Sequence, residues 1–138
     1  MNEPASDSPR SEDVPKRLRD LRRGLLHLHK ALLDAERVIY EQAHGRVSSG
    51  ELLQLVINHE QFAWLHSISE IIVRIDETMD ADEPTTREDI DLLLAQAGAL
   101  LKPSETGSDF QRKYYAALQR EPAAVLAHRE AMLILSTA

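Results

Sequence analysis

The longest regular pattern in this chain is "LRDLRRGLLHLHKALLDAERVI", residues 18–39. Apolar side chains recur in it at spacings of three and four, which is the pattern of a helix that packs along its length. The repeating positions are Leu18, Leu21, Leu25, Leu28, Leu32, Ala35 and Ile39. With Asp13 as a cap and Pro15 in the first turn, the pattern predicts a helix of about 30 residues that ends near His44–Gly45.

A break in the helical pattern is expected within "VINHEQFAWLHSISE", residues 56–70. Ser48 and Glu51 form a capping-box sequence, which predicts the start of a short helix. At about 100° per residue, the apolar residues of that helix lie on a different face from those of residues 64–79. Because one straight helix cannot bury both faces, we expect a break around Asn58–His59–Glu60, with Asn58 and Gln61 as the new cap.

Further helices are expected in the second half of the chain. Capping-box sequences occur at Thr85 with Glu88 and at Ser108 with Gln111. Pro122 is expected to kink or break the last helix. The core face of the last segment is predicted to comprise Val125, His128, Met132 and Leu135.

Together these segments predict an all-α protein. No run of alternating β-branched residues indicates a strand. The expected architecture is an up-down four-helix bundle with a short extra helix and a Pro-kinked or broken last helix. Residues 14–138 are expected to form a single bundle domain, and residues 1–13 a disordered tail, because the tail is polar and almost without apolar residues.

Composition and charge exclude several classes of site. The 138 residues carry a formal net charge of −7 and include no cysteine, which excludes disulfides, thiol nucleophiles and cysteine-ligated metal sites. Neither a membrane-spanning apolar run nor a secretory signal is visible, so a cytoplasmic location without membrane contact is expected. The basic segment 16–23 and the acidic segment 76–91 are expected at one end of the bundle, where they either pair or leave the basic segment to a partner.

The sequence offers only weak candidates for a metal, cofactor or catalytic site. They are His59, His66 and His128 for a metal, and Trp64, His66 and His128 for a small molecule. A core histidine with one satisfied ring nitrogen is the simpler interpretation of His128. Glu41 and His44 supply only one of the two Glu-x-x-His pairs that a di-iron bundle uses. No phosphate-binding loop and no hydrolase or zinc-protease motif is present, so no cofactor is predicted and an enzyme is disfavoured.

Association with another protein is the leading functional interpretation. Leu26, Leu33 and Tyr40 form a second apolar line beside the main seam, which indicates either deeper burial in the bundle or the face of a homodimer. The basic residues Arg17, Arg22 and Arg23 are further candidates for contact with a partner. The alternatives are a bundle that binds a metal or small molecule and, less favoured in an acidic chain, contact of segment 16–23 with a nucleic acid or an acidic partner.

The stretch "GRVSSGELLQL", followed by "QFAWL" and later by "FQRKYYAALQ" and "VLAH", resembles a family of small, uncharacterised, all-helical bacterial proteins. The resemblance covers most of the chain after the N-terminal tail. It implies a bacterial, cytoplasmic and helical protein, and it carries no activity that transfers to particular residues.

Overall fold

The computed structural model describes residues 13–136, which form six α-helices and one 3-10 helix and contain no strand. The helices are α1 (Asp13–His44), α2 (Ser49–Asn58), η2 (Glu60–Leu65), α3 (His66–Asp80), α4 (Arg87–Leu100), α5 (Asp109–Arg120) and α6 (Pro122–Ser136). The all-α prediction is therefore confirmed for this part of the chain. The predicted disordered tail lies outside the described residues, except for Asp13, which is the first residue of α1.

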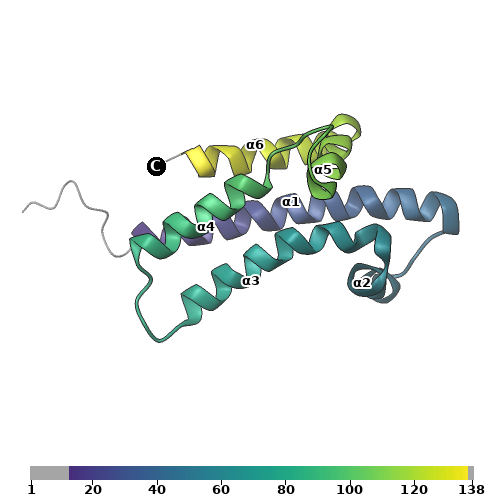
Figure 1. Ribbon diagram of the computed structural model, residues 1–138. Coiled ribbons are helices and arrows are strands. Elements are labelled where there is room, and N and C mark those ends of the chain that lie inside the picture. Colours follow the sequence, from purple (N-terminus) through teal and green to yellow (C-terminus); the bar gives the residue numbers. More distant parts are fainter. Residues whose placement is uncertain (1–12, 137–138) are drawn as a thin grey trace, which may run out of the picture.

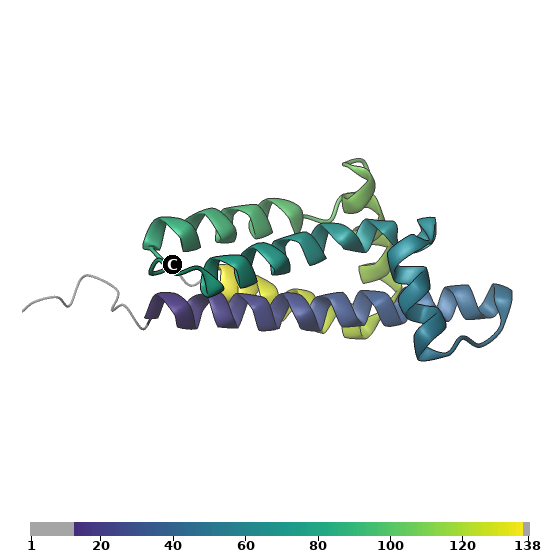
Figure 2. The same cartoon turned by 90° about the horizontal axis from the view of Figure 1, so that it is seen from below.

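Four helices lie lengthwise beside one another, namely α1, α3, α4 and α6 (Figures 1 and 2). Helix α1 contacts α6, α3 and α4, and α4 also contacts both α3 and α6. Helices α2 and α5 both lie toward the His44 end of α1, on opposite sides of it in the view of Figure 1. None of the helices within residues 13–136 combines the length and the apolar content needed to cross a membrane.

Helix α1 supplies the centre of the core through its predicted seam. Five seam leucines, Leu18, Leu21, Leu25, Leu28 and Leu32, are fully buried. Ile39, the last predicted member, is 39% exposed, so the seam ends earlier than expected. Figure 1 shows that the His44 end of α1 extends beyond α3 and α6.

The short helix and the break after it follow the predicted pattern closely. Ser48 and Glu51 form the expected capping box at the start of α2, which ends at Asn58. The next cap is His59 rather than the predicted Asn58, because the His59 ring nitrogen Nδ1 accepts a hydrogen bond from the backbone N–H of Gln61 at 3.1 Å. η2 then leads into α3, and together they bury Phe62, Trp64, Leu65 and the isoleucines of α3.

Two later helix starts test the capping predictions. Ser108 and Gln111 form the predicted capping box of α5. The cap of α4 is Thr86 with Asp89, one residue later than the predicted Thr85 with Glu88. In the structure Thr86 and Asp89 make both hydrogen bonds of the capping box, and the helix that follows buries Ile90, Leu93 and Ala97.

Helix α6 faces the core with small residues. Pro122 begins α6 and Glu121 separates it from α5, so the predicted break is confirmed. The predicted core face was wrong at Val125, which is 45% exposed, and the fully buried residues are Ala124, Ala127 and Ala131. The predicted Met132 and Leu135 do pack against the core, where they are partly buried. The alanines allow close approach to α1, since a Cβ added at Gly24 would lie 2.8 Å from Ile134 Cδ1 and 3.9 Å from Ala131 Cα.

Candidate helix-docking groove between α1 and α6

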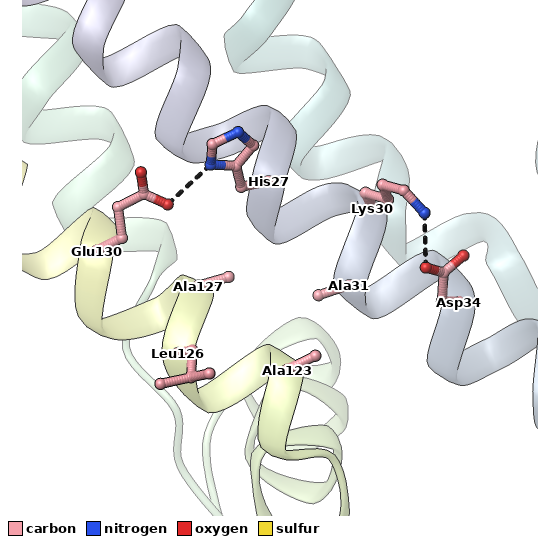
Figure 3. A pocket seen from close by; sticks show the side chains of 8 residues that line it. All are labelled: His27, Lys30, Ala31, Asp34, Ala123, Leu126, Ala127 and Glu130. Carbon is pink, nitrogen blue, oxygen red and sulfur yellow. Dashed lines mark hydrogen bonds and ion pairs between the residues drawn. The ribbon is translucent and has the colours of Figure 1, made fainter.

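A shallow groove, open to solvent, runs between α1 and α6 and has a volume of about 350 Å³. Its α1 wall consists of His27, Lys30, Ala31 and Asp34, and its α6 wall of Ala123, Leu126, Ala127 and Glu130 (Figure 3). Each set has the spacing i, i+3, i+4, i+7. Four residues with this spacing surround the hole that receives one side chain of a packed neighbouring helix. The groove therefore has the residue spacing of a helix-docking site on both walls.

The floor of the groove is apolar and its rim is charged. Ala31, Ala123 and Ala127 line the space between the helices, and their small side chains leave it open (Figure 3). At the rim, His27 Nδ1 and Glu130 Oε1 are 2.9 Å apart, and Lys30 Nζ donates to Asp34 Oδ2 at 2.8 Å. The His27–Glu130 contact links the two walls, whereas the Lys30–Asp34 pair lies within α1. Larger side chains at the alanine positions would fill the hollow.

The outer face of α6 continues the groove as an exposed apolar surface. Leu126 is 68% exposed and Leu133, two helical turns further on, is 60% exposed. Arg129 lies between them in sequence, is exposed and forms no ion pair with any residue in the described range. A helix that is apolar on all sides is normally buried on all sides. Helix α6 instead buries alanines and exposes two leucines, which marks this face as uncovered in the single chain.

The apolar line predicted from the sequence on α1 is largely occupied within the chain. Leu33 and Tyr40 pack against the core, and the Tyr40 ring stacks on His44 and contacts His59 and Phe62. Only Leu26 of this line is well exposed, at 38%. These contacts favour the interpretation of deeper burial for Leu33 and Tyr40.

The basic segment at the start of α1 contacts the acidic segment within the same chain. Arg22 Nε donates to Asp76 Oδ1 at 2.6 Å, which joins α1 to α3. Arg23 pairs with Asp20 at 2.9 Å within α1, and Arg17 is also engaged in an interaction. The predicted juxtaposition of segments 16–23 and 76–91 is therefore present at Arg22 and Asp76. Of the exposed basic residues in this segment, Arg19 forms no ion pair among the residues described.

The weak ligand-site candidates Trp64, His59 and His66 are held by contacts within the protein. Trp64 is buried and its Nε1–H donates to Glu36 Oε2 at 2.8 Å. The exposed ring of His66 donates from Nε2 to the Val56 carbonyl at 2.7 Å, and this bond ties α3 back to α2. His59 acts as the cap described above, so the His59–His66 pair does not form one site.

His128 satisfies one ring nitrogen inside the fold, as predicted. Its Nδ1 lies 2.5 Å from the Tyr114 hydroxyl, and the two rings are 5.4 Å apart. Burial lowers the pKa of His128 and raises the pKa of Tyr114. Both side chains are therefore neutral near pH 7, and the Tyr114 O–H donates to the imidazole nitrogen.

Histidines and carboxylates elsewhere in the described part of the fold do not converge on a metal site either. His27 and His29 point to different helices, since His27 meets Glu130 of α6 and His29 Nε2 lies 3.2 Å from Ser69 Oγ of α3. Glu41 accepts hydrogen bonds from Val47 N and Arg37 Nε, and these bonds hold the loop after α1. Within residues 13–136, no three histidine or acidic side chains are grouped so that they could hold a metal ion.

Sequence reasoning did not identify the groove or the exposed face of α6. One signal was present, because Ala123, Ala124, Ala127 and Ala131 give α6 a small-residue face while Leu126 and Leu133 lie elsewhere. Large apolar residues are normally assigned to the core first, and that rule is misleading for a helix that packs through alanine.

Comparison with protein-family models, with curated proteins and with solved structures finds no match to this chain.

Proposed function

We propose that this protein is non-enzymatic and acts by association with a protein partner, as a homodimer, through the groove between α1 and α6 and the outer face of α6. The observation that carries the proposal is that the fully buried residues of α6 are alanines, whereas Leu126 and Leu133 are exposed. Met132, Ile134 and Leu135 pack only partly against the core. Exposed apolar patches of this kind on a folded surface are typical of interaction sites. We also propose, from the resemblance of its sequence to small helical bacterial proteins, that it acts in the bacterial cytoplasm.

We further propose that α1, α3, α4 and α6 form an up-down four-helix bundle. The contacts of α1 with α3 and α6, and of α4 with the same two helices, support this arrangement. In such a bundle each helix is covered on two sides by its neighbours and has one outward face. The outward face of α6 is then free to contact a second copy.

Sedimentation velocity of the untagged protein tests the proposed association. The wild type is expected to be a dimer at micromolar concentrations, and Leu126→Glu is expected to be a monomer, because it places a charge in the centre of the apolar face. The matched control is Leu92→Glu, since Leu92 lies on α4 and is exposed to the same 60% as Leu133. Circular dichroism checks that both variants remain helical.

Three outcomes of this experiment are informative. A wild type that remains monomeric at the highest soluble concentration contradicts self-association. A dimer that survives Leu126→Glu but dissociates in Leu26→Glu assigns the interface to the exposed part of α1 instead. A dimer that dissociates equally in Leu92→Glu shows that any added surface charge weakens it, which removes the assignment to α6.

A further inference from the structure

We infer that the second copy packs on α6 antiparallel, related by a two-fold axis between residues 129 and 130, so that Leu133 of each copy enters the groove of the other. This inference rests on the proposed self-association and adds the partner's orientation and residue pairing. It is carried by three features of α6, which are the spacing of its exposed leucines, the charges between them and the position of the groove.

The spacing of the leucines defines one symmetrical register. When two copies of a helix pack antiparallel about a two-fold axis, each residue faces a residue equally far from the axis in the other copy. An axis between residues 129 and 130 places Leu126 of each copy opposite Leu133 of the other copy. The two leucines are two turns apart and lie on one side of the helix, so both pairs form in the same interface.

The charges near the axis are complementary in this register. Arg129 then faces Glu130 of the second copy, and the contact occurs twice. Arg129 has no ion-pair partner within the described part of its own chain, and Glu130 uses only Oε1 in its contact with His27. A parallel arrangement with Leu126 facing Leu126 would instead bring Arg129 beside Arg129, which repels. The charges therefore favour the antiparallel arrangement.

The groove lies at the position where, in this register, Leu133 of the second copy meets the protein surface. Its α6 wall, Ala123, Leu126, Ala127 and Glu130, is centred between residues 126 and 127. The facing position in the second copy is then at residues 132–133, so that Leu133 projects into the hole over the alanine floor (Figure 3). Helix α6 thus carries the projecting side chain and one wall of the groove that receives it, and α1 of the same chain supplies the other wall. This self-complementarity points to a second copy as the occupant.

Cross-linking of single-cysteine variants tests the register, because the wild-type chain contains no cysteine. Leu126→Cys and Leu133→Cys are each treated with a short bismaleimide, separately and after the two variants have been refolded together. The expected result is efficient cross-linking in the mixture and little in either variant alone. Leu92→Cys, refolded and treated in the same way, reports collisional cross-linking.

Charge exchange at the axis gives a second readout. Arg129→Glu and Glu130→Arg each place like charges opposite one another, and each is expected to raise the dimer dissociation constant about tenfold. The double variant Arg129→Glu/Glu130→Arg restores opposite charges across the axis and is expected to recover most of the affinity. Loss of the His27 contact in Glu130→Arg acts within one chain, and His27→Gln measures its effect separately.

The outcomes separate this inference from the function on which it rests. Efficient cross-linking of Leu126→Cys to a second copy of the same variant overturns the register. A double charge variant that dimerises no more tightly than the single variants also overturns it. In either case, a dimer that dissociates in Leu126→Glu still supports the proposed association. Absence of cross-links in all samples of a protein that sediments as a dimer also overturns the register. A wild type that never dimerises overturns both.

Discussion

At the scale of single residues, Glu36 is the most constrained side chain. It is the one charged residue buried among those that the structure describes, with 8% of its surface exposed. Trp64 Nε1 donates to its Oε2 at 2.8 Å, Gln61 Nε2 donates to its Oε1 at 3.3 Å, and Arg120 lies 3.9 Å from the same oxygen. A buried carboxylate is tolerated only when it is hydrogen-bonded. Glu36 of α1 is therefore linked to η2 through Trp64 and Gln61, and to α5 through Arg120.

Removal of the Glu36 carboxylate is expected to destabilise the protein. Glu36→Ala leaves the buried Trp64 N–H without its acceptor, which costs about 1–3 kcal/mol. Glu36→Gln is the matched control, because its amide oxygen can still accept the Trp64 hydrogen bond, and a smaller loss is expected. Trp64 is the chain's single tryptophan, so urea unfolding followed by its fluorescence measures both variants. Equal losses in the two variants would mean that the charge, and not the acceptor, stabilises this junction.

At the scale of elements, the helix ends depend on local residue chemistry. Helix α1 ends at His44 and is followed by Gly45, whose φ of 88° lies in the left-handed region. The Gly45 N–H donates to the Glu41 carbonyl at 2.8 Å. This conformation ends the helix, and Glu41 and Arg37 then hold Val47 so that the chain turns into α2. Hydrogen bonds from the Val47 backbone N–H and from Arg37 lower the pKa of Glu41.

Two glycine substitutions are expected to change stability in opposite directions. Gly45→Ala forces a Cβ into a left-handed conformation and should reduce the free energy of unfolding by about 1–2 kcal/mol. Gly98→Ala should raise it by about 0.5–1 kcal/mol, because Gly98 lies within α4 and an added Cβ meets no atom within 4 Å. Urea unfolding midpoints measure both changes. A stabilising Gly45→Ala would contradict the role assigned to the turn after α1.

At the scale of the whole molecule, two partly buried histidines couple folding to pH. His29 contacts α3 through Ser69, and His128 contacts α5 through Tyr114, so they lie in different parts of the fold. Burial lowers the pKa of both below the ordinary value of 6.5, with a smaller contribution at His29 from the nearby His66. The folded protein therefore binds protons less readily than the unfolded chain at both positions.

Stability is expected to fall as the solution is acidified below pH 6.5. Above that pH both histidines are neutral in the folded and unfolded states, so neither of them favours unfolding and the free energy of unfolding is at its full value with respect to them. As the pH falls toward the lowered folded pKa values, the unfolded chain takes up protons first and becomes favoured. Urea midpoints between pH 7.5 and 5 measure this loss, and a His29→Gln/His128→Gln variant should show a flatter profile over the same range. An unchanged slope would assign the pH dependence to other groups.

Lowered carboxylate pKa values act in a separate pH range. The pKa values of Asp20, Glu41 and Glu51 lie below ordinary values of 3.8 or 4.5, owing mainly to hydrogen bonds from Lys16, Val47 and Ser48, respectively. The stability that these three carboxylates contribute to the folded protein is lost only as the pH falls below those ordinary pKa values. The histidine effect can therefore be measured above pH 5 without interference from these groups.

Much of the helical organisation could be predicted from local spacing. The leucine seam of α1, the capping boxes at Ser48 and Ser108, the break near His59 and the break at Pro122 all involve residues within one or two turns of each other. Their physical causes are backbone hydrogen bonds and helix geometry, which act over that distance. The Thr85 and Thr86 alternatives differ by one residue, and spacing along the chain does not choose between them; the structure caps α4 at Thr86.

The candidate site could not be predicted in the same way, because contacts between distant segments create it. Helix α6 is apolar on several faces, and its inward face was selected by close packing of Ala131 and Ile134 against Gly24, more than 100 residues earlier. That packing leaves Leu126 and Leu133 outside and opens the groove beside Ala31. Glu36 is likewise buried by Trp64 and Gln61, which its own helix does not contain. Spacing along the chain thus accounts for where each helix begins and ends, whereas packing between helices selects the surface that remains for a partner, because burial depends on neighbours that local sequence does not specify.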